Sequence, residues 1–240
     1  MKIIPLSEGS FTIDKSKQFV PFDEKEHALQ ERPVGSLLVE IQPFLVITSR
    51  DIILLDTGLG FNDADGKLQL HKNLMAHHIN PSEVSKVFLS HLHKDHAGGA
   101  GHNAALNFPQ AAYYVQQKEL DFAFEKGVPS FILSDLECLQ QNEKVIMLDG
   151  DGFIDDYIEY RISGAHSPFH QVCWIREEGE TVFFGGDEAP QLQQMKHRFV
   201  AKYDADGRKA MEYRKQWWEE GREQGWKFLF YHDIKSPVWG

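Results

Sequence analysis

The segment Ser90-His91-Leu92-His93-Lys94-Asp95-His96-Ala97-Gly98-Gly99 decides the interpretation of this chain of 240 residues. It contains three histidines and one aspartate, and their nitrogen and oxygen atoms are ligands for metal ions. An apolar stretch precedes it and predicts a strand, so the segment should begin in an extended form. In an extended chain His91 and His93 point the same way and can reach one ion, whereas on a helix they diverge by about 200°. Asp95 and His96 follow where the chain turns, and they can face a second ion nearby.

Three further residues that could bind a metal ion follow later predicted strands: His166, Asp187 and His232. Strand ends that meet at one edge of a sheet bring their side chains together, and ligand sites of α/β proteins lie at such edges. The sequence therefore predicts a metal site built from five histidines and two aspartates.

The pattern of apolar residues predicts an alternation of strands and helices. The predicted strands cover residues 37–41, 44–48, 52–56, 87–90, 112–115, 157–162, 172–176, 181–184 and 226–231. The predicted helices cover residues 66–79, 116–125 and 208–224, and Gly225 ends the last one as a residue favoured at helix C-termini. This order predicts a layered α/β fold.

Composition and charge exclude several classes of protein. The chain has 25 Lys and Arg against 36 Asp and Glu, a net charge of −11, which disfavours binding to nucleic acid. No apolar run approaches the ~20 residues that span a bilayer, so no membrane association is expected. The polar start predicts a cytoplasmic protein. Cys138 and Cys173 lie far apart and are expected to be buried thiols.

The motif His-x-His-x-Asp-His at 91–96, with Gly98-Gly99, resembles the metal-binding motif of the metallo-β-lactamase superfamily. Further matches follow in the order of that superfamily: Asp56-Thr57-Gly58, the segment Ser-Gly-Ala-His-Ser-Pro-Phe-His at 163–170, Gly186-Asp187 and Tyr231-His232-Asp233. The resemblance covers nearly the whole chain. It implies one domain over residues 1–240 with a four-layered αβ/βα sandwich, in which two mixed β-sheets are flanked by helices.

The resemblance also implies a role for each matching residue. One metal ion would be bound by His91, His93 and His166, the second by Asp95, His96 and His232, and Asp187 would bridge them. Asp95 and Asp187 would thereby take part in catalysis. Asp56 would orient ligands through hydrogen bonds, although it can also be read as a turn residue after a strand. His170 would lie behind the ligands or be structural.

The implied function is that of a dinuclear, metal-dependent hydrolase. A hydroxide that bridges two divalent ions would cleave a small ester, foremost a lactone or a related carboxylic or phosphoric ester. Zn²⁺ is the first expectation, and Mn, Fe or Co stay open because nitrogen and oxygen ligands suit all of them. The pattern is most similar to the branch with acyl-homoserine lactonases and organophosphate hydrolases. The alternatives are a glyoxalase-II-like thioesterase and a persulfide dioxygenase-like oxidoreductase with one iron.

The substrate is expected to be a small molecule, neutral and partly hydrophobic. Its pocket is expected to draw on these apolar residues: Phe19, Phe22, Phe122, Phe124, Phe131, Ile132, Leu192, Met195 and Phe199. Pro190 stands where some lactonases carry a tyrosine that contacts the substrate carbonyl, and Phe169 should add bulk beside the metals. Tyr203 is interpreted as a packing residue, and the charges of 208–224, Arg214 included, as a solvated helix face. The oligomeric state, a homodimer included, stays open.

Overall fold

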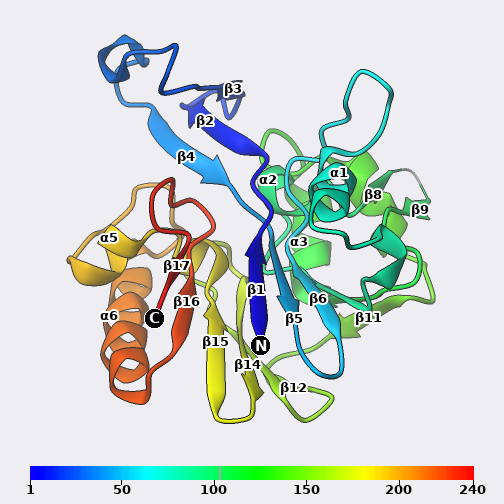
Figure 1. The fold of residues 1–240 in the computed structure, drawn as a ribbon. Helices are drawn as coiled ribbons and strands as arrows, with labels where there is room; N and C mark the ends of the chain where they lie inside the picture. Colours follow the sequence, from blue (N-terminus) through cyan, green and yellow to red (C-terminus); the bar gives the residue numbers. More distant parts are fainter. Residues whose placement is uncertain (103) are drawn as a thin grey trace.

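Two six-stranded sheets form the centre of the computed structural model, which describes residues 1–102 and 104–240 (Figure 1). The first sheet has the spatial order β1 (Lys2–Pro5), β5 (Phe44–Ile47), β6 (Ile52–Leu55), β7 (Lys86–Phe88), β10 (Ala112–Gln116) and β11 (Val145–Leu148). The second has the order β12 (Gly152–Ile154), β13 (Ile158–Ile162), β14 (Gln171–Glu177), β15 (Glu180–Phe184), β16 (Lys227–Leu229) and β17 (Val238–Trp239). Both sheets contain parallel and antiparallel pairs, as predicted.

Helices cover the outer face of each sheet. The first sheet packs against α1 (Gln69–Ala76), α3 (Gln117–Lys126) and α4 (Leu133–Leu136). The second packs against α5 (Leu192–Lys196) and α6 (Gly207–Gln224). The order helix, sheet, sheet, helix confirms the predicted four-layered sandwich (Figure 1).

Shorter elements complete the chain. A three-stranded sheet of β2 (Gly9–Ile13), β3 (Phe19–Pro21) and β4 (Leu37–Ile41) projects beyond the two layers (Figure 1). The other short elements are η1 (Leu29–Glu31), η2 (Pro81–Glu83), α2 (Lys94–Ala97), β8 (Gly101–His102), β9 (Ala105–Leu106), η3 (Glu137–Leu139) and η4 (Gly186–Glu188). The predicted helix over 66–79 and strand over 226–231 are both shorter than expected, since α1 begins at Gln69 and β16 ends at Leu229.

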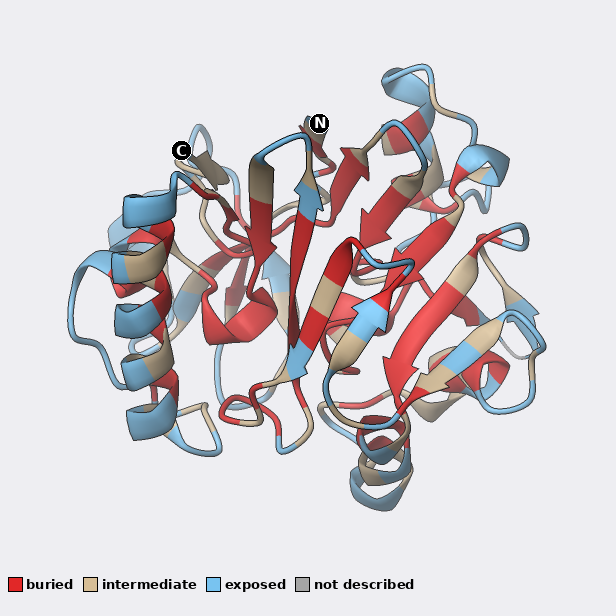
Figure 2. Ribbon diagram, turned by 90° about the horizontal axis from the view of Figure 1, so that it is seen from below, coloured by how far each residue is buried: buried red, intermediate tan, exposed pale blue. Residues whose placement is uncertain are grey.

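The central strands are apolar on both faces because each sheet is covered on both sides. Along β6, Leu54 packs toward the helices, whereas Ile53 and Leu55 pack between the two sheets. Strands buried on both faces read as continuous apolar runs rather than as alternating ones. Figure 2 shows these buried strands in the middle of the molecule, beside a long helix α6 that is buried on one side only.

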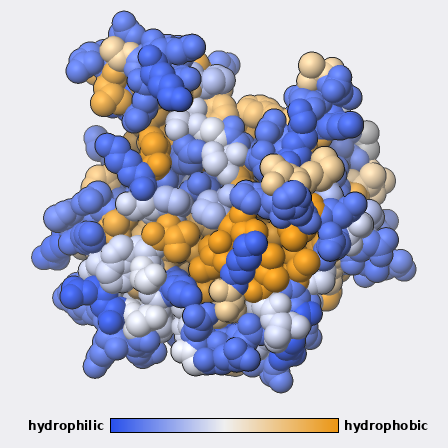
Figure 3. All heavy atoms as spheres, in the orientation of Figure 1, coloured by the Kyte–Doolittle hydropathy of each residue, from blue (hydrophilic) through white to orange (hydrophobic). Residues whose placement is uncertain are grey.

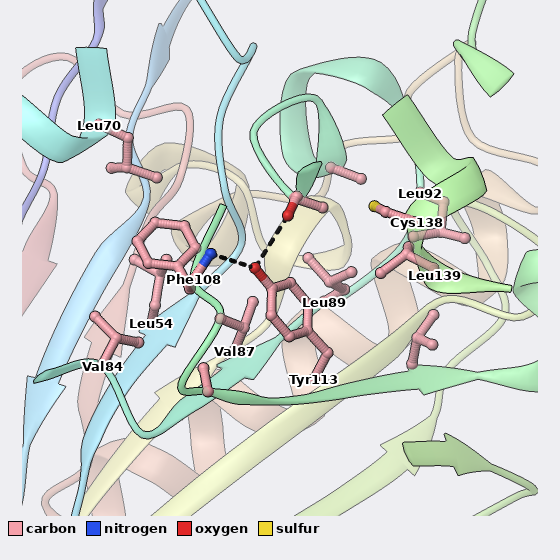
Figure 4. Packing of buried hydrophobic residues seen from close by; sticks show 14 of the residues in the cluster. Leu54, Leu70, Val84, Val87, Leu89, Leu92, Phe108, Tyr113, Cys138 and Leu139 are labelled. Atoms are coloured by element: carbon pink, nitrogen blue, oxygen red, sulfur yellow. Dashed lines mark hydrogen bonds between the residues drawn. The ribbon is translucent and has the colours of Figure 1, made fainter. Parts of the chain in front are cut away.

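A buried hydroxyl group ties the loop after α2 to the core of the first sheet. Tyr113 Oη accepts a hydrogen bond from Phe108 N and donates one to Ala100 O, both at 3.0 Å (Figure 4). Ala100 directly follows the histidine-rich segment, so this contact anchors the end of that segment against the core.

Two further sequence expectations concern the cysteines and membrane-spanning segments. Cys138 and Cys173 are both free and buried, as predicted. In the described part of the chain, no helix combines the length and the apolar character that crossing a bilayer requires.

Glu8 connects the first strands to the loop after β6. Its Oε2 accepts a hydrogen bond from Leu59 N at 2.7 Å, whereas its buried Oε1 has no hydrogen-bond partner among the described residues. Burial raises the pKa of Glu8 from its ordinary 4.5 to about 7, against the smaller effect of the Leu59 hydrogen bond.

This pKa predicts a pH-dependent stability. Between about pH 4.5 and 7 the folded protein holds a proton that the unfolded chain releases, so the contribution of Glu8 falls as the pH rises through this window. Glu8→Gln keeps the acceptor for Leu59 N without the charge. We expect the variant to gain stability over the parent as the pH rises, by no more than about 3 kcal/mol above pH 7.

Urea unfolding of both proteins between about pH 4.5 and pH 8 measures this difference. The exposed Glu143→Gln is the matched control and should show no such trend. A stability difference between Glu8→Gln and the parent that does not change with pH would contradict the assignment.

Candidate metal centre

The histidine-rich segment follows β7 and occupies a loop and the short helix α2. His91 and His93 lie in the loop, and Asp95 and His96 lie on α2. A Cβ atom on Gly98 or Gly99 would collide with the carbonyl oxygen of Leu59 or of Thr57, respectively. The two glycines therefore permit a close approach between this segment and the loop after β6. Gly98 itself has a φ of −60°, which any residue adopts.

The structure brings all seven predicted side chains together in two groups. The first group contains His91, His93, His166 and Asp187, and the second contains Asp95, His96 and His232. Within each group, one ligand atom from every residue lies within 4.8 Å of the others. The loops that carry them follow β7, β13, β15 and β16, so both central sheets contribute.

In the first group three ring nitrogens converge. His93 Nδ1 lies 3.0 Å from His91 Nε2 and 3.1 Å from His166 Nε2. The outer nitrogens are engaged elsewhere, since His91 Nδ1 donates to Ser90 Oγ at 3.1 Å and His166 Nδ1 donates to Asp204 Oδ1 at 2.9 Å. A hydrogen bond on one ring nitrogen leaves the lone pair of the other free to bind a metal.

The second group shows the same arrangement. Asp95 Oδ2 lies 3.7 Å from His96 Nε2 and 3.6 Å from His232 Nε2. The outer nitrogen of His96 donates to Asp56 Oδ2 at 2.7 Å, and that of His232 donates to the carbonyl oxygen of Glu40 at 2.7 Å. Both rings are therefore fixed with Nε2 toward the site.

Asp187 lies between the two groups. Its Oδ1 is 3.2 Å from His96 Nε2 and 3.0 Å from His232 Nε2, and its Oδ2 is 3.2 Å from His166 Nε2. Burial alone would raise the pKa of Asp187, but the charges of these three histidines hold it well below its usual range. The side chain is therefore a carboxylate that both groups share.

Two atoms at the centre of the site are buried without a hydrogen bond. Within the described residues, His96 Nε2 and Asp187 Oδ1 form none, although they lie 3.2 Å apart. Buried polar atoms are nearly always paired, so unpaired ones at a converging donor set are what a metal-binding site requires. Nitrogen and carboxylate donors suit divalent transition metals, and the residues present fit such ions.

Electrostatics separates the histidines into two kinds. Burial, followed by neighbouring charged groups, lowers the pKa of His91 and His93 well below the usual range, so these rings are neutral. Burial also lowers the pKa of His96, His166 and His232, but Asp187 and other carboxylates more than reverse this effect. Neutral imidazole is the form that binds metals, so a cation must displace protons around Asp187.

Asp56 and His170 support the groups from behind. Asp56 is buried, has a φ of +57° directly after β6, and accepts hydrogen bonds from Ser90 N and Ser90 Oγ at 2.7 Å as well as from His96. It is thus both a turn residue and a hydrogen-bond partner of a predicted ligand. His170 lies outside both groups, and its Nε2 accepts a hydrogen bond from Asp187 N at 3.2 Å while Nδ1 contacts Ser163 Oγ at 3.0 Å.

Two residues behind His166 were missed or misread from the sequence. Asp204 was not predicted as a site residue, yet it accepts the His166 hydrogen bond. Arg214 was expected to face solvent, but it is buried. It is 1% exposed, donates to Glu188 O at 3.0 Å and Phe199 O at 2.8 Å, and lies 3.8 Å from Asp204. Its spacing in the sequence indicated this burial, because Arg214 lies on the same face of α6 as the buried residues Ala210, Trp217 and Gly221.

A cavity of about 720 Å³ opens onto this site. His93, Asp95, Asp187 and His232 line it together with apolar residues from β2, β4 and the segment between α5 and α6. Pro190 and Tyr203 also line it, so Tyr203 faces the cavity in addition to packing against the ring of His166, whose centre lies 5.9 Å away. Tyr203 Oη accepts a hydrogen bond from Gln194 Nε2 at 3.1 Å.

The predicted pocket residues are mostly elsewhere. Among the described residues Phe19 and Phe199 line the cavity, whereas these do not: Phe22, Phe122, Phe124, Phe131, Ile132, Leu192 and Met195. Phe131 packs in the core on the outer face of the first sheet, and Met195 packs in the core on the outer face of the second. Burying these apolar side chains between helix and sheet stabilises the fold. Phe169 was expected to add bulk beside the metals, but its ring lies against Phe122 at 6.1 Å.

Comparisons with known proteins agree with this architecture. The curated relative N-acyl homoserine lactonase AttM of Azorhizobium caulinodans is 30% identical over 41% of this chain, and the match covers 38% of the relative's length. A probable metal-dependent hydrolase from Staphylococcus aureus has a TM-score of 0.80 at 21% identity, over 99% of this chain and 91% of that one. The dizinc quorum-quenching lactonase AidC has a TM-score of 0.71 at 19% identity, over 98% and 88%. At these identities the structures show a shared fold.

The family model described as the metallo-beta-lactamase superfamily matches residues 40–223. This range includes six of the seven clustered residues and every strand from β5 to β15. The resemblance found in the sequence is thereby confirmed, and the chain belongs to the metallo-beta-lactamase superfamily.

Proposed function

We propose that the protein is a dinuclear metal-dependent hydrolase of small esters, with lactones as the first substrate class. His91, His93 and His166 would hold one divalent ion and Asp95, His96 and His232 the second, while Asp187 would touch both. Zn²⁺ is the ion we expect. The observation that carries the proposal is the pair of donor groups that share one carboxylate and face one cavity.

Two such ions lower the pKa of water toward ~7 and polarise the oxygen of an ester. The residues of the chain contribute position and proton transfer. The Asp95 side chain lines the cavity and is 13% exposed, so its carboxylate can accept a proton from an attacking water and deliver it to the leaving oxygen. The buried histidines and their outer hydrogen bonds fix the geometry before substrate binds.

The relatives support an ester substrate. The curated relative is named as an N-acyl homoserine lactonase, and AidC was solved with the product N-hexanoyl-L-homoserine. The proposal extends this chemistry to the present chain. We further infer one domain over residues 1–240, because the inner core between the sheets takes residues from both halves of the chain. A cytoplasmic location and a homodimer stay predictions.

A substrate panel tests the proposed function directly. The purified protein, with its metal content measured, is assayed on lactones, thioesters, phosphotriesters and phosphodiesters. We expect the highest kcat/KM on lactones or related esters. Highest activity on thioesters would instead favour the glyoxalase-II-like alternative.

The first site prediction concerns metal content. Because two donor groups are present, we expect close to two transition-metal ions per chain by elemental analysis. Removal by a chelator should abolish hydrolysis, and added Zn²⁺ should restore it. A fully active preparation with a single iron per chain would overturn the dinuclear site and favour the persulfide dioxygenase-like alternative.

The second site prediction separates Asp187 from Asp56. Asp187→Asn removes the shared negative charge with little change in shape, so two cations would repel each other with less compensation. We expect loss of one metal ion and a fall in turnover of at least about 10²-fold. Asp56→Asn should weaken metal affinity or activity by about 10- to 100-fold, since it alters a hydrogen-bond partner of His96 and Ser90 and not a proposed metal ligand.

Metal content, turnover and melting temperature are measured for both variants, with the exposed Asp65→Asn as a control for the lost charge. We expect the control to match the parent. Two bound ions and near-parental turnover in Asp187→Asn would contradict the role of this residue.

A further inference from the structure

Lysine side chains gather around the cavity of a chain that is acidic overall. Lys15, Lys17, Lys94 and Lys202 line the cavity, and Asp14 is the one acidic lining residue outside the proposed ligand set in the described chain. The net charge of the whole protein is −11, so this is a local reversal of sign.

These four lysines differ from others that neutralise carboxylates. Lys72 pairs with Asp63 and Lys86 pairs with Asp51, both at 2.6 Å. Over residues 1–102 and 104–240, none of the four cavity lysines forms an ion pair. Their charges are therefore available to a bound molecule.

The backbone and the surrounding contacts hold Lys17 and Lys94 in place. Lys17 lies in the turn between β2 and β3 with a φ of +58°, and its N donates to Asp14 O at 3.1 Å. Non-glycine residues rarely adopt such a φ, and they often do so at functional sites. Lys94 begins α2 between His93 and Asp95, and its Nζ lies 5.7 Å from the ring centre of Phe19.

Lys17 and Lys94 line the same cavity as His93, Asp95 and Asp187. Lys17 and Lys94 are half-buried, whereas Lys15 and Lys202 are exposed. The lysines thus extend from the neighbourhood of His93 to the outer rim.

Apolar residues form the wall between these charges. Ile13, Leu37, Val39, Phe199 and Val200 line the cavity. In the space-filling view the projecting sheet of β2, β3 and β4 carries hydrophobic residues among hydrophilic ones (Figure 3). A molecule that matches this cavity has a reacting ester group, an apolar middle and a negative charge.

We propose that the substrate is an ester with an anionic group, a carboxylate or a phosphate, remote from the bond that is cleaved, and that Lys17 and Lys94 bind this group. The inference rests on the proposed hydrolase function and replaces the neutral substrate expected from the sequence. Clefts lined by one sign of charge raise the local concentration of oppositely charged substrates by about 10- to 10³-fold.

Two matched esters test the inference: 4-nitrophenyl hexanoate, which is neutral, and 4-nitrophenyl hemiadipate, in which a carboxylate replaces the terminal methyl group of an acyl chain of the same length. The methylene chain keeps this carboxylate remote from the ester carbonyl. We expect the metal-loaded protein to hydrolyse the hemiadipate with a kcat/KM at least about tenfold higher. An ester of similar length with a terminal phosphonate distinguishes the two anions. Preference for either anionic ester over the hexanoate supports the inference and identifies the group.

The double variant Lys17→Met/Lys94→Met should reduce the ratio of the two kcat/KM values to about one. Lys144→Met is the control, because it removes one lysine charge at an exposed position that does not line the cavity. It should leave the ratio unchanged. A ratio near one in the parent, or a ratio that the double variant does not change, would overturn the inference.

Binding measurements separate this inference from the proposed function. Calorimetry compares the affinities of adipate and hexanoate for the parent and the double variant, with metal content held equal. Hydrolysis of both esters without a charge preference supports the hydrolase function and refutes the anionic substrate. If neither ester is hydrolysed, tighter binding of adipate that the double variant loses still supports the anion site, and equal binding of the two acids refutes it.

Discussion

The carboxylate of Asp187 is the contact on which the site depends. It meets ring nitrogens of His96, His166 and His232, which come from loops of both central sheets. The histidine charges keep this buried group ionised against the cost of burial. A negative charge shared by two sets of donors at the junction of two sheets is suited to holding two cations close together.

The layers of the fold fix this junction. The apolar core between the two sheets holds them face to face, so that their edges lie next to each other. The loops at these edges carry the donor residues. Behind the donors, Asp56 and Asp204 hold the outer nitrogens of His96 and His166. Arg214 extends the support to α6, so that a helix on the outer layer contributes to the position of a ligand.

The sequence predicts the donor set better than its surroundings. All seven donors sit in a dense motif or just after predicted strands, and strand ends at one edge of a sheet bring their side chains together. Asp204 precedes α6 in a segment without a strand or motif to place it, so its hydrogen bond to His166 could not be predicted from the sequence. The spacing of Arg214 along the buried stripe of α6 indicates burial, but its contact with Asp204 depends on how α6 packs. Phe131 and Met195 were expected in the pocket but lie in the cores. From the sequence alone, an apolar residue of a core cannot be distinguished from one that lines a pocket. The lysines around the cavity come from segments far apart in sequence, so their grouping required the fold.

The most direct test of the shared-carboxylate site is the anomalous scattering of crystals of the metal-loaded protein, measured at the absorption edge of the bound metal. We expect two peaks about 3.5–4 Å apart, one beside each donor group, with Asp187 between them. A single peak, or peaks that do not contact Asp187, would contradict this arrangement.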